Sequence, residues 1–445
     1  MTEHASTVWF GLDPFWLSTA ILIVTYAVII SERVNRAIVA LLGAGAMIFT
    51  GVLNQEQAIE GQDFNTLALL VGMMILVAIA KRSGMFQYLA VWSARVSRGH
   101  PWALLALLSV VTAVVSALLD NVTTVLLIAP VTLVITDQLR VPPYPFLFTE
   151  ILASNIGGTA TLIGDPPNIL IGSAVGLSFN DFAVNLTPVI LVILLVQLVI
   201  NHLLWGRQMK GDAEARAQVM AFNAAETITD SALLWKSLFV IGLVILGFIT
   251  ARFIGLEAGT IALAGAALLL LLDCWPKERE QQTHRLNEMF AEVEWVTIFF
   301  FVGLFVVVAG VEHGGLLNWF ADSVLSLTGG DLTVTALAIL WASAILSAII
   351  DNIPFVATMI PVIKNMAPTF GGPEGLMPLW WSLSLGACLG GNGTLIGASA
   401  NLTVAGIAER AGVPFRFLTF LKLAFPMMLM SIVVSTIYVY FVYLV

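Results

Sequence analysis

Charged side chains are scarce in this sequence. Asp, Glu, Lys and Arg together make up 11% of its 445 residues, whereas about a quarter of a soluble domain is charged. Hydrophobic residues account for 59%, and the mean hydropathy is +0.96. This composition excludes a soluble globular domain. It predicts an all-α polytopic membrane protein, because a helix satisfies its own backbone hydrogen bonds in lipid.

Several chemical motifs are missing as well. Cys274 and Cys388 are too few for a disulfide framework and lack metal-ligand spacing. No Gly-x-x-x-x-Gly-Lys-Ser/Thr pattern occurs, so ATP hydrolysis would require a separate soluble subunit. Residues 1–15 carry Glu3 and Asp13 but no basic segment, so we expect a retained first span rather than a cleaved signal. The sequence shows neither a nucleophile–base pair nor a metal-ligand cluster, which argues against an enzyme.

The chain contains an internal repeat. Residues 116–130, centred on Asp120-Asn121, recur 231 positions later as residues 347–361, centred on Asp351-Asn352. Each copy places a carboxylate inside apolar sequence, which is costly in hydrocarbon and is retained where it functions. Matched halves of this kind are typical of secondary transporters.

The repeat extends over nearly the whole chain. Beyond residue 130 the offset becomes 233, which aligns Asn168 with Asn401. We therefore expect a first repeat over residues 1–206, a cytoplasmic linker over 207–231 and a second repeat over 232–445. The linker contains Arg207, Lys210, Asp212, Glu214 and Arg216, and we expect it to serve only as a connection.

Each half is expected to have five spans, one of them broken, and one helical hairpin. Uninterrupted spans are predicted near 16–31, 36–53, 65–80, 187–206, 234–251, 258–274, 295–311 and 418–444. Amphipathic segments are predicted near 84–97 and 315–327, and broken spans near 157–168 and 378–408. The hairpin arms are predicted over 101–119 and 122–138, and over 332–350 and 353–366.

An odd number of crossings per half inverts the second repeat, giving about ten spans with both termini outside. All of the 19 Lys and Arg residues except Arg252 and Lys364 then fall on the cytoplasmic side, which agrees with the positive-inside rule. The hairpins are expected to be re-entrant, the Asp120 tip entering from the cytoplasm and the Asp351 tip from outside. No basic residue is expected at the site between them.

Three aspartates are candidates for proton or sodium coupling. Asp120 and Asp351 are preferred, and the alternative, which is compatible, is that each caps the second arm of its own hairpin. Asp165 has Ala398 as its counterpart. It is either a third titratable group or the cap of a helix that starts at Pro166, and the cap is favoured.

Neutral polar residues form the candidate substrate site. Asn121 and Asn352 could orient substrate or a cation, or staple the hairpins. Thr123 and Thr124 have no hydroxyl counterpart in the second copy, so the site is expected to be asymmetric. The breaks add Asn155, Gly157, Gly158, Thr159, Asn168, Gly390, Gly391, Asn392, Thr394 and Asn401, whose polar members could equally make packing hydrogen bonds.

These motifs resemble a known group of transporters. Residues 119–130, residues 154–168 and Asp351-Asn-Ile-Pro are similar to the ion transporter superfamily, in the branch with ArsB-type arsenite permeases, NhaD sodium/proton antiporters and P proteins. The first tip, Leu119-Asp120-Asn121, is closer to P proteins and NhaD than to arsenite permeases, whereas Gly164-Asp-Pro-Pro-Asn168 is unlike NhaD. The resemblance implies an elevator-like movement of hairpins and broken spans against a scaffold, and a homodimer.

The expected function is proton-coupled efflux of arsenite and antimonite across the plasma (inner) membrane, because these neutral trihydroxides suit a site without cationic residues. Alternatives are sodium/proton antiport on the same aspartates, anion or dicarboxylate symport, a passive channel and an intramembrane enzyme. The expected partners are a small inorganic substrate and the bilayer, with a soluble ATPase subunit left open. Neither nucleic acid nor a cofactor other than the coupling H⁺ or Na⁺ is expected.

Overall fold

The computed structural model describes residues 8–31, 33–207, 209 and 212–445, and within these ranges every regular element is a helix. Glu3 and Lys210 lie outside the described residues. Eight of the described helices are long and apolar enough to cross a membrane, judged by length and composition. They include α4 (Phe64–Lys81), α6 (Pro101–Leu118), α7 (Asn121–Gln138), α10 (Phe179–Asn201), α12 (Ser231–Ile254), α15 (Trp295–His313), α17 (Leu332–Ile349) and α21 (Phe417–Val439).

The other helices are shorter. Three are apolar: α1 (Pro14–Ile30), α2 (Arg36–Phe49) and α13 (Ala258–Cys274). Five belong to the second hairpin and the broken spans: α8 (Tyr144–Thr159), α9 (Pro166–Val175), α18 (Asn352–Asn365), α19 (Met377–Gly390) and α20 (Ser399–Arg410). Five more are α3 (Gln55–Glu60), α5 (Met85–Val96), α11 (Ala213–Met220), α14 (Arg279–Ala291) and α16 (Leu316–Thr328). Every predicted span and hairpin arm coincides with a helix, whereas α3, α11 and α14 were not predicted.

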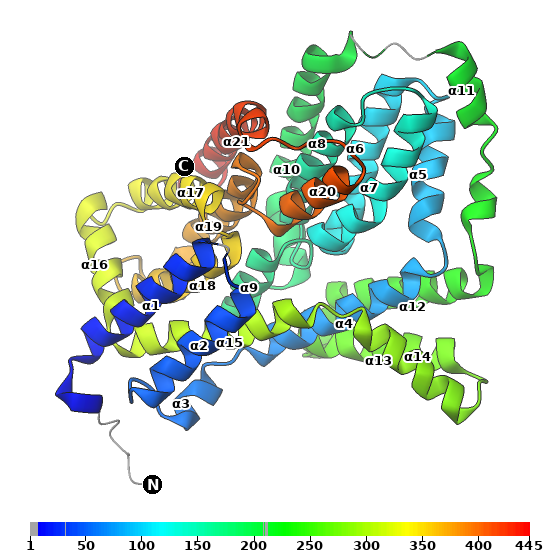
Figure 1. Ribbon diagram of the computed structural model, residues 1–445. Helices are drawn as coiled ribbons and strands as arrows, with labels where there is room; N and C mark the ends of the chain where they lie inside the picture. The colour runs from blue at the N-terminus through cyan, green and yellow to red at the C-terminus, as the bar shows by residue number, and fades with distance from the viewer. Residues whose placement is uncertain (1–7, 32, 208, 210–211) are drawn as a thin grey trace.

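The helices form two groups in Figure 1. Helices α2, α4, α13 and α15, here called the lower layer, run across the lower part of the view, and the helices α6–α9 and α17–α21, here called the bundle, lie above them. The bundle helix α9 contacts α4, and the bundle helix α18 contacts α15. The hairpin tips and the breaks in the two broken spans therefore face the lower layer.

Two glycines set the helix crossings of the lower layer. A Cβ at Gly72 of α4 would lie 2.6 Å from the carbonyl carbon of Ala262 of α13. A Cβ at Gly303 of α15 would lie 2.5 Å from the carbonyl carbon of Ala40 of α2. Only glycine permits such close backbone approach. Each crossing joins a helix of one predicted repeat to a helix of the other.

Within the bundle, α6 of the first hairpin crosses α8 closely. A Cβ at Gly157 would lie 2.1 Å from the carbonyl oxygen of Ala113. Near this crossing the Ser116 hydroxyl donates to the carbonyl of Ser154 at 2.6 Å. The α6 arm is therefore held against the first broken span just before the Asp120 tip.

The same contacts recur between α17 and α19. A Cβ at Gly390 would lie 2.5 Å from the carbonyl oxygen of Ala344, and the Ser347 hydroxyl donates to the carbonyl of Ala387 at 2.6 Å. In addition, α18 packs on α9 and α20 packs on α7, so helices of the two predicted repeats contact one another.

The predicted linker packs against the rest of the protein. Its helix α11 packs on α5 and α7, and Asp212 pairs with Arg140 at 3.5 Å. The amide of Thr229 donates to the carbonyl of Ser83 at 3.0 Å. The linker is thereby tied to both the hairpin and the end of α4.

Candidate functional site

Both hairpin tips begin a helix with an aspartate cap. Asp120 accepts the Thr123 amide at 2.8 Å and the Thr123 hydroxyl, and Asp351 accepts the Ile353 amide at 3.1 Å. The capping alternative is thus present at both tips. Each cap leaves further lone pairs on the carboxylate, so capping does not use up either aspartate.

The two breaks are closed by equivalent asparagines. Asn168 Nδ2 donates to the carbonyls of Thr159 at 3.1 Å and Thr161 at 2.9 Å. Asn401 Nδ2 donates to the carbonyls of Gly391 and Thr394, both at 2.8 Å. Backbone groups freed at the breaks must be satisfied inside the protein. Both asparagines therefore have a structural task, and the Asn168 oxygen also accepts from the Ser384 hydroxyl at 2.6 Å.

Asp165 does not cap α9, although that role was the favoured expectation. It precedes Pro166 and Pro167, which have no amide hydrogen, and its side chain makes no capping bond. Its Oδ1 instead accepts from Asn352 Nδ2 of the opposite hairpin at 3.4 Å. Asp165 is 1% exposed, and its Oδ2 has no hydrogen-bond partner among the described residues.

Asn155 is the centre of a network of four amides. Its Oδ1 accepts from Asn121 Nδ2 at 3.0 Å, and its Nδ2 lies 2.9 Å from both Asn392 Oδ1 and Asn401 Oδ1. All four side chains are buried. The network links the first hairpin tip to the breaks of both repeats.

Substituting Asn155 tests whether this network holds the site together. Asn155→Ala would leave three buried polar atoms unpaired, and we expect a loss of about 3 kcal/mol in stability. Thermal melting of the purified protein measures it. Ser154→Ala is the matched control, because among the described residues the Ser154 hydroxyl bonds only within α8, to the carbonyl of Ile151. Equal melting temperatures for the two variants would contradict the expectation.

The hairpin tips and the first break enclose a small cavity of about 30 Å³. Four of the expected site residues line it: Asp120, Asn121, Asp165 and Asn352. Asn121 Oδ1 and Asp165 Oδ2 are buried and have no hydrogen-bond partner among the described residues. Two unpartnered oxygen acceptors beside a cavity of this size can hold one small cation or one water molecule.

The expectation that no basic residue reaches the site is wrong. Arg36 lines the cavity, and its Nη1 lies 2.6 Å from Asp351 Oδ2. The physical reason is helix length. Helices α1 and α2 have 17 and 14 residues, or about 25 and 21 Å, which is less than the hydrocarbon thickness. The turn between them can therefore lie below the membrane surface, although its charge suggested a surface loop.

The remaining expected residues lie outside the lining of this cavity. Thr124 is fully buried and its hydroxyl has no partner among the described residues, whereas Thr123 is bonded to Asp120. Hydroxyls at the breaks bond to backbone carbonyls, Thr159 to that of Asn155 and Thr394 to that of Ala348. The glycines permit close backbone approach: Gly157 to α6, Gly390 to α17, Gly158 to Gly164 and Gly391 to Gly397.

Four polar residues at the site were not predicted: Arg36, Glu294, Thr297 and Ser399. Glu294 had a signal in the repeat, because it stands 231 positions after Asp63. It precedes α15 and accepts the Thr297 hydroxyl at 3.2 Å. The repeat offset, applied to every acidic residue, would have identified it.

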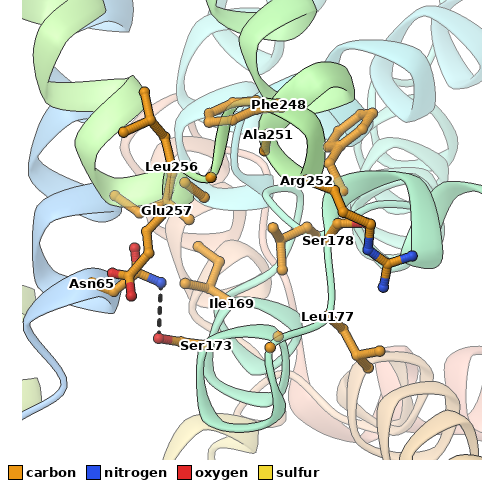
Figure 2. Close-up of a pocket in the computed structure, with 17 residues that line it drawn as sticks. Asn65, Ile169, Ser173, Leu177, Ser178, Phe248, Ala251, Arg252, Leu256 and Glu257 are labelled. Carbon is orange, nitrogen blue, oxygen red and sulfur yellow. Dashed lines mark hydrogen bonds between the residues drawn. The ribbon is translucent and has the colours of Figure 1, made fainter.

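A larger pocket lies away from the aspartates. It measures about 270 Å³ and is formed between α4, α9, α12 and the start of α13, as Figure 2 shows. Across it, Asn65 Nδ2 donates to the Ser173 hydroxyl at 2.9 Å (Figure 2). The pocket contains Arg252 and Glu257 but none of the repeated polar residues, so we do not assign it as the transport site.

Comparison with known proteins agrees with this architecture. The family model described as "Citrate transporter" matches residues 26–386. A Mycobacterium tuberculosis protein named as an uncharacterized transporter is 41% identical over 433 residues, covering 96% of this chain and 99% of its own length. The human P protein is 36% identical over 505 residues, and the match covers 95% of this chain but only 59% of the P protein.

The fold also occurs in a solved transporter structure. The YdaH transporter of Alcanivorax borkumensis superposes with a TM-score of 0.60 at 16% identity, covering 97% of this chain and 99% of that one. At this identity the likeness shows the fold alone. The family match and the sequence relatives place the chain among secondary transporters of the ion transporter superfamily. The chain belongs to the citrate transporter (CitMHS) family.

Proposed function

We propose that this secondary transporter carries its coupling cation, H⁺ or Na⁺, in the cavity between the hairpin tips, and that cation/proton antiport is its activity. The observation that supports the proposal is the pair of unpartnered oxygens, Asn121 Oδ1 and Asp165 Oδ2, beside a cavity of about 30 Å³. Asp120 and Glu294 add carboxylates to this cavity, and Asp351 lines the neighbouring one. Oxygen ligands suit hard cations, and buried carboxylates suit protons.

Efflux of arsenite and antimonite is the second candidate. The Asn352 amide, which lines the cavity, favours it, since an amide can bond a neutral trihydroxide. Two observations weaken it. Arg36 brings a positive charge to the site, and the cavity is small for a trihydroxide. We therefore rank it below cation/proton antiport.

The proposed topology has two inverted repeats of five spans each, with re-entrant hairpins and both termini outside the plasma membrane. The boundaries stay those proposed from the sequence: 1–206, 207–231 and 232–445. Transport would occur by an elevator-like movement of the bundle against the lower layer. We propose no enzymatic activity, no cofactor and no nucleic-acid partner. A homodimer and a complex with a soluble ATPase subunit are assembly states to test.

A panel of ions in proteoliposomes tests the proposed function. With an imposed pH gradient and a pH-sensitive dye, a pulse of Na⁺ or Li⁺ is expected to dissipate the gradient in wild-type vesicles, whereas Asp120→Asn vesicles respond much less. Arsenite, antimonite and citrate are added in parallel. If arsenite accumulates against its gradient while no metal cation affects the pH, the second candidate replaces the first. Flux of any ion only down its own gradient would instead indicate a channel.

A further inference from the structure

Arg36 stands at the boundary between two cavities. The inner cavity, described above, contains Asp120 and Asp165. A larger cavity of about 360 Å³ lies beside it and is lined by Asn35, Asp351 and Thr403, together with apolar side chains of α1, α17 and α20. Arg36 and Ser399 line both cavities. The Arg36 side chain therefore lies where the two cavities adjoin.

The guanidinium group is held by partners from three helices. Nη1 lies 2.6 Å from Asp351 Oδ2 and 3.0 Å from the Ser399 hydroxyl, and Nη2 lies 3.3 Å from the Thr297 hydroxyl. The group also lies over the Phe300 ring, 5.0 Å from its centroid. These contacts fix a positive charge on the Asp351 carboxylate, where a soluble cation would otherwise bind.

Only one positive side chain compensates several carboxylates here. Arg36 is the sole basic residue among the described residues that line the inner cavity, and it faces Asp120, Asp165 and Glu294 there, besides its partner Asp351. The Thr297 hydroxyl connects Arg36 to Glu294. An unpaired charge is costly inside a membrane protein, so Asp351 needs a cation at all times.

We infer that Arg36 is a resident cation of the transport site, and that a sodium-sized monovalent cation binds Asp351 only by displacing it. The inference rests on the proposed function, which places the cation in the inner cavity, next to the Arg36–Asp351 pair. It identifies Arg36 as a specificity-determining residue, because a cation that binds Asp351 too weakly to displace Arg36 is excluded. Asp351 then carries one positive partner in both the loaded and the empty transporter.

The position of the ion pair couples cation binding to movement. Arg36 begins α2 of the lower layer, whereas Asp351 and Ser399 belong to the bundle. Displacing Arg36 therefore breaks a contact between the two groups of helices at the moment the cation binds. The bundle is released when it is loaded, and the contact reforms when the cation leaves.

Thermal melting of the purified protein tests this exchange without a transport assay. The Arg36→Gln variant lacks the resident positive charge, so a soluble cation can bind Asp351 in its place. In N-methyl-D-glucamine chloride we expect Arg36→Gln to melt well below wild type, and in NaCl of equal ionic strength to recover by roughly 5 °C. Wild type should show a much smaller difference between the two salts. Equal responses of wild type and Arg36→Gln would overturn the inference.

Two further variants make the test specific. Arg36→Gln combined with Asp351→Asn removes both charges, and its melting temperature should not distinguish the two salts; a retained sodium response would place the cation elsewhere and overturn the inference. If Arg36→Gln does not fold, Arg36→Lys serves, since lysine keeps the charge but not the forked contacts. It should respond to sodium more than wild type, and an unchanged response counts against the inference. If the wild-type protein shows no cation-coupled transport, the proposed function is refuted instead. The comparison of melting temperatures in the two salts still tests the role of Arg36.

Discussion

Replacing Asp165 by asparagine is expected to reduce coupled transport by roughly 100-fold, the equivalent of one lost charged interaction of about 3 kcal/mol. Asparagine keeps the shape of the side chain and an oxygen that can still accept from Asn352. It removes the negative charge beside the cavity. Because Asp165 Oδ2 is buried and has no hydrogen-bond partner among the described residues, its charge has no evident structural use.

The measurement is the initial rate of pH-gradient dissipation in proteoliposomes after a sodium pulse. Asp137→Asn is the control, because Asp137 lies exposed near the end of α7 and its loss changes net charge equally. Melting temperatures of both variants should stay near wild type. If Asp165→Asn transports at the wild-type rate with coupling intact, Asp165 is only an acceptor for Asn352.

Adding one methyl group at either bundle crossing is expected to be strongly destabilising. In Gly157→Ala the new Cβ would lie 2.1 Å from the Ala113 carbonyl oxygen, and in Gly390→Ala 2.5 Å from that of Ala344. Backbone atoms cannot rotate away as side chains can, so α6 and α8, or α17 and α19, must separate. We expect a cost of about 3 kcal/mol, seen as a fall in melting temperature of roughly 3 °C for a chain of this length.

Gly242→Ala is the matched control for the two crossings. Gly242 lies within α12, and a Cβ there would meet no other atom within 4 Å. Since alanine favours helix over glycine, this variant should melt at the wild-type temperature or slightly above. A similar loss at all three positions would mean that glycine substitution itself, rather than the close crossings, causes the effect.

The helices and their breaks were predictable because they depend on local sequence and on the repeat. The length of the apolar stretches predicted the spans, and the paired Asp-Asn segments predicted the hairpin tips. Glycine and proline predicted the breaks at α8–α9 and α19–α20. The polar helices α11 and α14 were not predicted, since neither has an apolar stretch of span length.

The errors at the site arose from contacts between segments far apart in the chain. Arg36, at the start of the span predicted over 36–53, was placed on the cytoplasmic side because charge alone places arginine near water, yet Asp351, 315 positions away, binds it. Asp165 was expected to follow the local rule for caps, but the Asn352 amide, 187 positions away, draws its side chain to the opposite hairpin. Rules based on local sequence cannot take account of a hydrogen-bond or ion-pair partner that lies far away in the chain.

The Asn155 network has a consequence for biosynthesis. The partners of its amide nitrogen, Asn392 and Asn401, follow 237 and 246 positions later, so the ribosome completes the proposed first repeat long before they exist. During that interval Asn155 and Asp165 lie in the membrane without their final partners. Water or the insertion machinery must shield Asp165 until α18 arrives and Asn155 until the residues around α20 arrive, so the proposed transport site is completed only in the last steps of synthesis.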